Sequence, residues 1–155
     1  ENFPPHYGMT TSYHLGQAQI VLDNSGDYSK SITLVAAGPM LGQSLGAAEL
    51  LAEQDIGSIV VNASAINHPD VETVTAALQK TNGKLITAED HEKIGGMGAL
   101  LVQSLANSGA KFQARTLGVN EEFGQSAYNA IDLYRKHGLD SKSIAKAAAS
   151  FLQEA

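Results

Sequence analysis

The sequence of 155 residues contains no cysteine, few basic residues and no long apolar run. The absence of cysteine excludes disulfides, a cysteine nucleophile and a thiolate metal site, but it does not bear on the redox compartment. Ten Lys and Arg residues, a net charge of −6 and no basic run give no electrostatic signature of a nucleic-acid or anionic-membrane partner. No apolar stretch is long enough to cross a bilayer or to act as a signal peptide. We therefore expect a soluble, cytoplasmic protein that binds neither nucleic acid nor membrane.

Aromatic residues are also scarce, at 6% of the chain, whereas glycine occurs 15 times. Small side chains let backbones approach closely, which favours helices packed tightly on a sheet. The apolar fraction of 43% is enough to fill one core in a chain of this length. The first residues are rich in turn-forming types and have no periodicity of their own. We therefore predict a connector from a missing upstream domain at residues 1–16 and one domain at residues 17–155.

Short apolar runs alternate along the chain with segments of helical periodicity. The runs predict five strands, at residues 18–22, 32–37, 58–61, 84–89 and 112–116. The periodic segments predict helices at residues 39–53, 70–80, 99–107, 127–137 and 144–152. We therefore predict an α/β fold in three layers, with an open, mostly parallel sheet of about five strands and helices on both faces.

Individual positions refine this arrangement. The nearly continuous apolar run at residues 32–37 is typical of a parallel strand that is covered on both faces. The first strand is expected at an edge of the sheet, and the last strand near an edge. Asp70 is placed to cap the start of its helix, and Gly138 is placed to cap the end of the helix before it.

Ligands of open α/β sheets bind beyond the carboxyl ends of the strands. Only the loop after the fourth predicted strand is rich in reactive groups, because Glu89, Asp90 and His91 precede a run containing Gly95 and Gly96. One interpretation makes His91 a proton carrier or metal ligand that Glu89 orients. The favoured interpretation is structural, because a helix dipole favours acidic residues before the first turn and glycines permit close packing. We therefore predict that residues 89–98 form an interface loop.

These residues do not complete a phosphate or metal motif. The glycines lack the G-x-G-x-x-G spacing and the Gly-Lys-Ser or Gly-Lys-Thr ending of a P-loop, and the neighbouring carboxylates would repel a pyrophosphate. No two histidines stand at the short spacing of a local zinc site. His68, which precedes a proline, is explained by turn chemistry. We assign no catalytic, cofactor-binding or metal-binding residue to this chain.

The segments, in this order, resemble the C-terminal domain shared by transketolases, 1-deoxy-D-xylulose-5-phosphate synthases and beta subunits of 2-oxoacid dehydrogenases. Each match is short, but the ordered set is specific and runs through most of the chain. The matching segments are residues 13–18 (YHLGQA), 32–38 (ITLVAAG), 47–51 (AAELL), 86–91 (ITAEDH), 95–98 (GGMG), 117–119 (LGV), 123–126 (FGQS) and 134–140 (YRKHGLD).

The resemblance implies a three-domain parent enzyme, a homodimer that uses thiamine diphosphate and magnesium. In such enzymes the first domain holds the diphosphate and metal through a Gly-Asp-Gly motif, and the second supplies the glutamate that activates the cofactor. Neither has a counterpart in this sequence. The chain is then predicted to be a non-catalytic assembly domain that binds no cofactor and is inactive alone. Its partners would be the upstream domains, on the same chain or on a separate subunit, and the complete enzyme would transfer two-carbon ketol units between sugar phosphates of the pentose phosphate pathway.

Two alternatives stay open. The parent is equally a synthase or a dehydrogenase by fold, although residues 123–126 resemble the Phe-Gly-x-Ser of transketolases and favour the transketolase. A different class of function is a free-standing small-ligand or regulatory α/β module, with residues 89–98 as its pocket.

Overall fold

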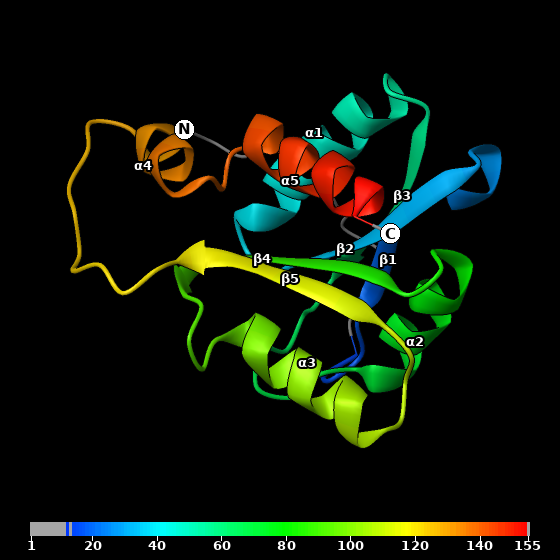
Figure 1. Cartoon of the computed structure of the whole chain (residues 1–155). Coiled ribbons are helices and arrows are strands. Elements are labelled where there is room, and N and C mark those ends of the chain that lie inside the picture. The colour runs from blue at the N-terminus through cyan, green and yellow to red at the C-terminus, as the bar shows by residue number, and fades with distance from the viewer. Residues whose placement is uncertain (1–11, 13, 155) are drawn as a thin grey trace.

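The computed structural model describes residue 12 and residues 14–154 (Figure 1). The predicted connector at residues 1–16 therefore lies largely outside the described residues. The strands are β1 (Gln19–Asp23), β2 (Lys30–Ala36), β3 (Ile56–Asn62), β4 (Lys84–Glu92) and β5 (Gln113–Val119). The helices are α1 (Met40–Ala52), α2 (Val71–Lys80), α3 (Met97–Asn107), α4 (Ala130–His137) and α5 (Ser141–Gln153), with a short 3-10 helix η1 (Ser25–Asp27) after β1.

The five strands form one sheet in the order β1-β3-β2-β4-β5. Strand β1 pairs antiparallel with β3, and the other pairs are parallel. The predicted α/β class, mostly parallel sheet and edge position of the first strand are confirmed. The last strand, β5, forms the opposite edge. Strand β2 lies at the centre, as its apolar run predicts, because both of its faces are covered.

Helices cover the two faces of the sheet in separate layers, with α1 and α5 on one side and α2 and α3 on the other (Figure 1). Successive residues of β2 alternate between these layers, as the pleat of a strand requires. Leu34 joins the core of α1 and α5, whereas Val35 joins the core of α2 and α3. Both side chains are 1% exposed. Burying each contributes about 1.5–3 kcal/mol to folding.

Helix α5 is held on the first layer by its apolar stripe and by polar contacts at both ends. Ile144, Ala148 and Phe151 are buried, which confirms the predicted amphipathic face. At the start, the backbone N–H of Ser141 donates to the side chain of Gln43 in α1 over 2.9 Å. At the end, the guanidinium of Arg115 in β5 lies 4.8 Å from the centre of the Phe151 ring, a cation–π contact. The C-terminal helix is therefore part of the domain core.

Two helix ends follow the local sequence signals. The carboxylate of Asp70 accepts a hydrogen bond from the backbone N–H of Thr73 over 3.0 Å, and it caps α2 as predicted. Gly138 ends α4 with a φ of 70°, in the left-handed region that glycine enters without strain.

Several predicted boundaries are wrong, and three of them bear on the site. Strand β4 continues to Glu92, where the sequence predicts a loop from residue 90, because Glu92 pairs with Val119 of β5. Helix α3 begins at Met97, two residues earlier than predicted, because Glu89 satisfies its first N–H groups. Helix α4 begins at Ala130 because Asn129 before it has an extended backbone. Among the described residues, no helix combines the length and apolar content needed to cross a membrane.

We predict that Asp70→Ala lowers the free energy of unfolding by about 1–2 kcal/mol. The carboxylate also accepts the N–H of Ala18 over 2.9 Å, so the substitution releases the chain entering β1 as well as the cap of α2. Urea unfolding followed by circular dichroism measures the loss. The control Gln79→Ala, on the exposed side of α2, changes this free energy by less than about 0.5 kcal/mol.

The pH dependence of this effect has a definite sign. Burial raises the pKa of Asp70, but the hydrogen bonds from Thr73 and Ala18 outweigh burial and hold the pKa below its usual range. The stabilisation is therefore complete above the pKa of the unfolded chain and is lost as pH falls through the pKa of the folded chain. The difference between wild type and Asp70→Ala should shrink in acid, and a difference that grows would contradict this assignment.

Candidate functional site

The reactive groups singled out in the sequence lie at the carboxyl end of β4. Alternation along this strand points Leu85, Thr87 and Glu89 toward the layer of α2 and α3. The Glu89 side chain is fully buried there, at 0% exposed. A carboxylate at such depth requires hydrogen-bond partners inside the protein, because water cannot reach it.

The partners of Glu89 are the first N–H groups of α3. Its Oε2 accepts the backbone N–H of Met97 over 2.6 Å, and its Oε1 accepts that of Gly98 over 3.1 Å. The residue at the N-cap position is Gly96, whose lack of a side chain leaves these donors without a local acceptor. Glu89 therefore caps α3 from the neighbouring strand, and the positive end of the helix dipole stabilises a negative charge at this place.

His91 is the third partner of the buried carboxylate. Its Nε2 lies 2.8 Å from Oε2 of Glu89, and its Nδ1 lies 3.8 Å from Oδ1 of Asp90. The His91 side chain is 44% exposed, so it reaches from the buried carboxylate to the surface. Glu89 thus orients His91, the arrangement that a proton-transfer interpretation requires. The same contact also fits a structural role, because His91 is a second partner for an oxygen that already accepts the N–H of Met97.

Glycines make room for the Glu89 side chain. A Cβ on Gly96 would collide with Oε2 of Glu89 and would lie 2.6 Å from the carbonyl oxygen of Glu92. A Cβ on Gly118 in β5 would lie 3.1 Å from Cγ of Glu89. Gly95 has a φ of 73°, so the turn before α3 uses the left-handed region. The glycine-rich run is therefore needed for close packing and for a tight turn.

Glu92 links this turn to the chain that follows β5. Its Oε1 accepts the backbone N–H of Ile94 over 3.2 Å, and its Oε2 accepts that of Glu121 over 2.8 Å. The hydrogen bond from Ile94, helped by the one from Glu121, lowers the pKa of Glu92 below its usual range although burial opposes it. Sequence reasoning missed this link and the close approach of Gly118, because both depend on β5, which lies more than twenty residues away in the chain.

The residues predicted to form an interface loop thus divide into two groups. Glu89 is buried and Gly96 contacts it, so both act inside the domain. Asp90, His91 and Gly95 reach the surface at the carboxyl end of the sheet. His68 is exposed on a different loop, before the cap of α2.

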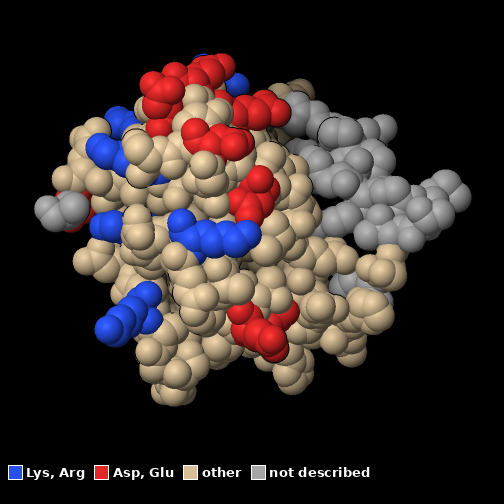
Figure 2. All heavy atoms as spheres, turned by 90° about the vertical axis from the view of Figure 1, so that its right-hand side faces the viewer, with Lys and Arg blue, Asp and Glu red and all other residues tan. Residues whose placement is uncertain are grey.

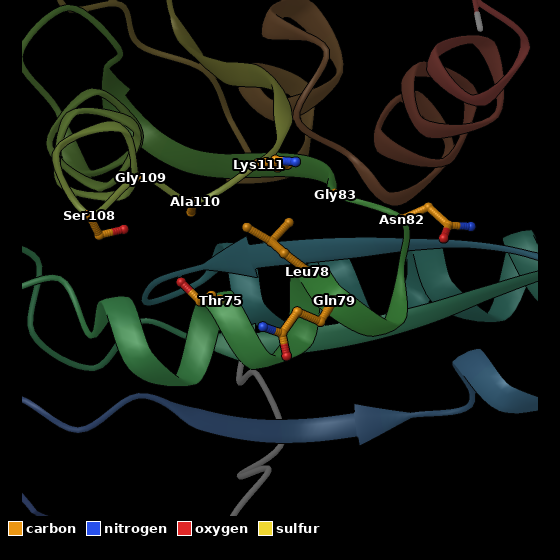
Figure 3. A pocket seen from close by; sticks show the side chains of 9 residues that line it. All are labelled: Thr75, Leu78, Gln79, Asn82, Gly83, Ser108, Gly109, Ala110 and Lys111. Atoms are coloured by element: carbon orange, nitrogen blue, oxygen red, sulfur yellow. The ribbon is translucent and has the colours of Figure 1, made fainter.

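Hollows occur at both ends of the sheet. At the carboxyl end, a hollow of about 340 Å³ lies between the end of β5, residues 122–125 and α4, with Asp90 and His137 among its lining residues. At the amino end, a hollow of about 490 Å³ lies between the ends of α2 and α3 (Figure 3). Figure 3 shows Leu78 pointing from α2 toward residues 108–111. Of the described residues that line this second hollow, Lys111 alone is ionisable, so the hollow offers no acid–base pair.

Charge marks no further site in the part of the chain that the structure describes. Among the described residues, no group of three or more His, Asp or Glu side chains is arranged to hold a metal ion. Figure 2 shows one face of the molecule, on which most Lys and Arg side chains lie in the left half and many Asp and Glu side chains gather at the top. The Lys and Arg side chains of this face are separated by other residues and do not form one continuous basic surface.

The fold and site define an open-sheet α/β domain whose buried carboxylate caps one of its own helices. A family model described as the C-terminal domain of transketolase matches residues 22–144. The chain belongs to this family. The resemblance noted in the sequence is thereby confirmed.

Individual relatives agree with this assignment. An apulose-4-phosphate transketolase subunit of Phocaeicola vulgatus is 31% identical over 140 residues, which cover 90% of this chain and 42% of that protein. The 1-deoxy-D-xylulose-5-phosphate synthase of Heliobacterium modesticaldum is 28% identical over 139 residues, which cover 89% of this chain and 20% of that protein. A solved structure described as a split gene transketolase, inactive beta4 tetramer, has a TM-score of 0.82 and 26% identity, and the match covers 97% of this chain and 46% of that one. The chain therefore spans less than half the length of each of these relatives.

We predict that Glu89→Gln lowers the free energy of unfolding by about 2–4 kcal/mol. An amide has one acceptor oxygen where the carboxylate has two, and its NH₂ group would face a backbone N–H donor. Urea unfolding at neutral pH measures the change. The matched control Asp90→Asn alters the neighbouring exposed carboxylate and changes this free energy by less than about 0.5 kcal/mol. Equal losses in the two variants would show that Glu89 does not cap α3.

Proposed function

We propose that this chain is the non-catalytic C-terminal assembly domain of a transketolase, a thiamine-diphosphate-dependent enzyme that transfers two-carbon ketol units between sugar phosphates. The observation that carries the proposal is that Glu89, a fully buried carboxylate at the carboxyl end of the sheet, caps a helix. Both of its oxygens accept backbone N–H groups of α3. A group committed to holding the fold is poorly placed to act on a substrate.

The binding requirements of the cofactor support the same division of roles between this chain and the upstream domains. Thiamine diphosphate needs a magnesium ion to hold its diphosphate and a carboxylate on its aminopyrimidine ring, as the family resemblance implies. The described residues do not fit these needs, because no acidic or histidine cluster is arranged for a metal and the buried carboxylate already has its partners. We therefore assign cofactor and magnesium to upstream domains, joined to this chain or carried on a separate subunit. The proposal includes a homodimeric, cytoplasmic enzyme.

The boundaries of the domain and its contacts belong to the proposal too. We assign residues 1–16 to a connector and residues 17–155 to the assembly domain. The exposed part of residues 89–98, which contains Asp90, His91 and Gly95, would contact the upstream domains. Glu89 and Gly96 would support this surface from below by fixing the turn between β4 and α3.

A synthase is the second candidate for the parent enzyme, because the Heliobacterium synthase matches this chain over a similar length. Residues 123–126 resemble the transketolase motif and favour a transketolase. The two enzymes differ in the two-carbon unit that they transfer, because the 1-deoxy product of the synthase has a methyl group where the product of a transketolase has a hydroxymethyl group. An assay with a ketose phosphate as the donor therefore tests for the transketolase.

We predict that the purified chain neither binds thiamine diphosphate appreciably nor transfers a ketol unit. The reason is that it lacks a metal and diphosphate site and lacks the activating carboxylate. The measurement is a ketol-transfer assay with xylulose 5-phosphate and ribose 5-phosphate, with cofactor and magnesium present. Activity should appear when the upstream domains are supplied, and comparable turnover by the chain alone would overturn this division of roles.

The same reconstitution also tests whether residues 89–98 contact the upstream domains. His91→Ala should weaken the association of this chain with the upstream domains by sedimentation, because His91 reaches the surface. Lys142→Ala, on α5, should leave association unchanged. Equal association of wild type and His91→Ala would remove residues 89–98 from the interface while leaving the functional assignment intact.

A further inference from the structure

Residues 120–129 connect β5 to α4 without helix or strand, and every one of them is exposed. Figure 1 shows this segment bowing away from the sheet before the chain returns to α4. Two of its side chains are aromatic: Phe123 is 97% exposed and Tyr128 is fully exposed. Exposed aromatic residues concentrated on one segment are unusual for a surface that faces only water, and aromatic residues are enriched where proteins bind each other.

Hydrogen bonds and an ion pair hold this segment in place, although the segment contributes no side chain to the core. At its base, the N–H of Glu121 donates to Glu92. In its middle, the Lys136 side chain of α4 lies 2.8 Å from the carboxylate of Glu122 and also bonds to Gln125. The hydrogen bond from Lys136, and to a smaller extent the one from Gln125, holds the pKa of Glu122 below its usual range. These contacts restrain the first half of the segment before any partner arrives, which reduces the entropy lost on binding.

A hollow lies beneath the segment and makes the surface concave. Its volume is about 340 Å³, and its apolar lining includes Val119, Phe123, Leu133 and Leu139. An apolar side chain from a partner fits such a place, because its burial removes apolar area from water on both sides. The segment therefore offers two protruding aromatic side chains and a receptive hollow beside them.

The size of this surface decides between two occupants. Two aromatic side chains bury about 300–500 Å² together, whereas a stable interface between free proteins buries about 800 Å² on each partner. The segment alone is too small to hold a second free copy. It suffices as one contact within a larger interface to a further part of the same enzyme. The relatives contain such a part, because this chain covers only 42% of the Phocaeicola protein and 46% of the matched structure.

We propose that residues 120–129 form a docking arm whose Phe123 and Tyr128 side chains enter apolar pockets on the upstream part of the same enzyme. This inference rests on the proposed function, because it takes the upstream transketolase domains as the partner. It adds two aromatic anchors to a turn, residues 89–98, whose own exposed large apolar side chain is Ile94. Glu92 connects the two, since its carboxylate binds the N–H of Ile94 on one side and of Glu121 on the other.

The experiment places a photo-crosslinking amino acid, p-benzoylphenylalanine, at position 123 of the complete enzyme. Peptides of the upstream part should be crosslinked after irradiation and identified by mass spectrometry. The same probe at Ile20, a partly exposed residue of edge strand β1, should give at least about tenfold less crosslinked product. Crosslinks from position 123 only to residues 12–154 of another copy, or to no protein, would overturn the docking arm.

A second measurement uses side-chain removal. The double variant Phe123→Ser with Tyr128→Ser should weaken association with the upstream part at least about tenfold, a loss typical of buried aromatic anchors. The control Ile20→Thr should leave association unchanged. Equal association of the double variant and wild type overturns the docking arm alone, whereas a wild-type chain that never associates with the upstream part overturns the proposed function itself.

Discussion

The hydrogen bonds from Met97 and Gly98 to the buried carboxylate of Glu89 join the central sheet to α3. Much of the carboxyl end of the domain depends on this contact. Because the carboxylate lies beneath the helix start, Gly96 and Gly118 must lack side chains. A side chain at either place disturbs the buried carboxylate, which is costly when it loses partners. A side chain at Gly95 meets no other group, and its cost is backbone strain in the left-handed region. The sequence in this region is thus constrained by one interaction.

The same contact is consistent with the assembly role that we propose for the polar cluster at the carboxyl end of the sheet. Both oxygens of Glu89 accept backbone N–H groups of α3, and the imidazole of His91 contacts Oε2 from the surface side. What remains accessible is a shaped surface: a fixed polar turn beside an arm with two exposed aromatic residues. Such a surface suits contact with another protein part, where complementarity and a few buried anchors supply most of the binding free energy.

Local signals in the sequence predicted much of the fold. The apolar run at residues 32–37 identified the central strand, and Asp70 and Gly138 marked helix ends because their chemistry acts within a few residues. The end of β4 was not predictable in this way, because Glu92 pairs with Val119, whose place in the sheet is set by β5. The depth of Glu89 did have a signal, since alternation from Leu85 through Thr87 points it toward α3. The exposed segment at residues 120–129 had none, because Ala127 falls at helical spacing with the residues of α4 although the helix begins later.

Hydrogen exchange of individual backbone amides, followed by NMR, tests the central claim most directly. The first N–H groups of a helix ordinarily exchange rapidly, because they lack acceptors within the helix. If Glu89 holds those of Met97 and Gly98, they exchange only when the whole domain unfolds, as slowly as the amides of β2. Exchange of these two amides orders of magnitude faster than that of β2 would contradict the account.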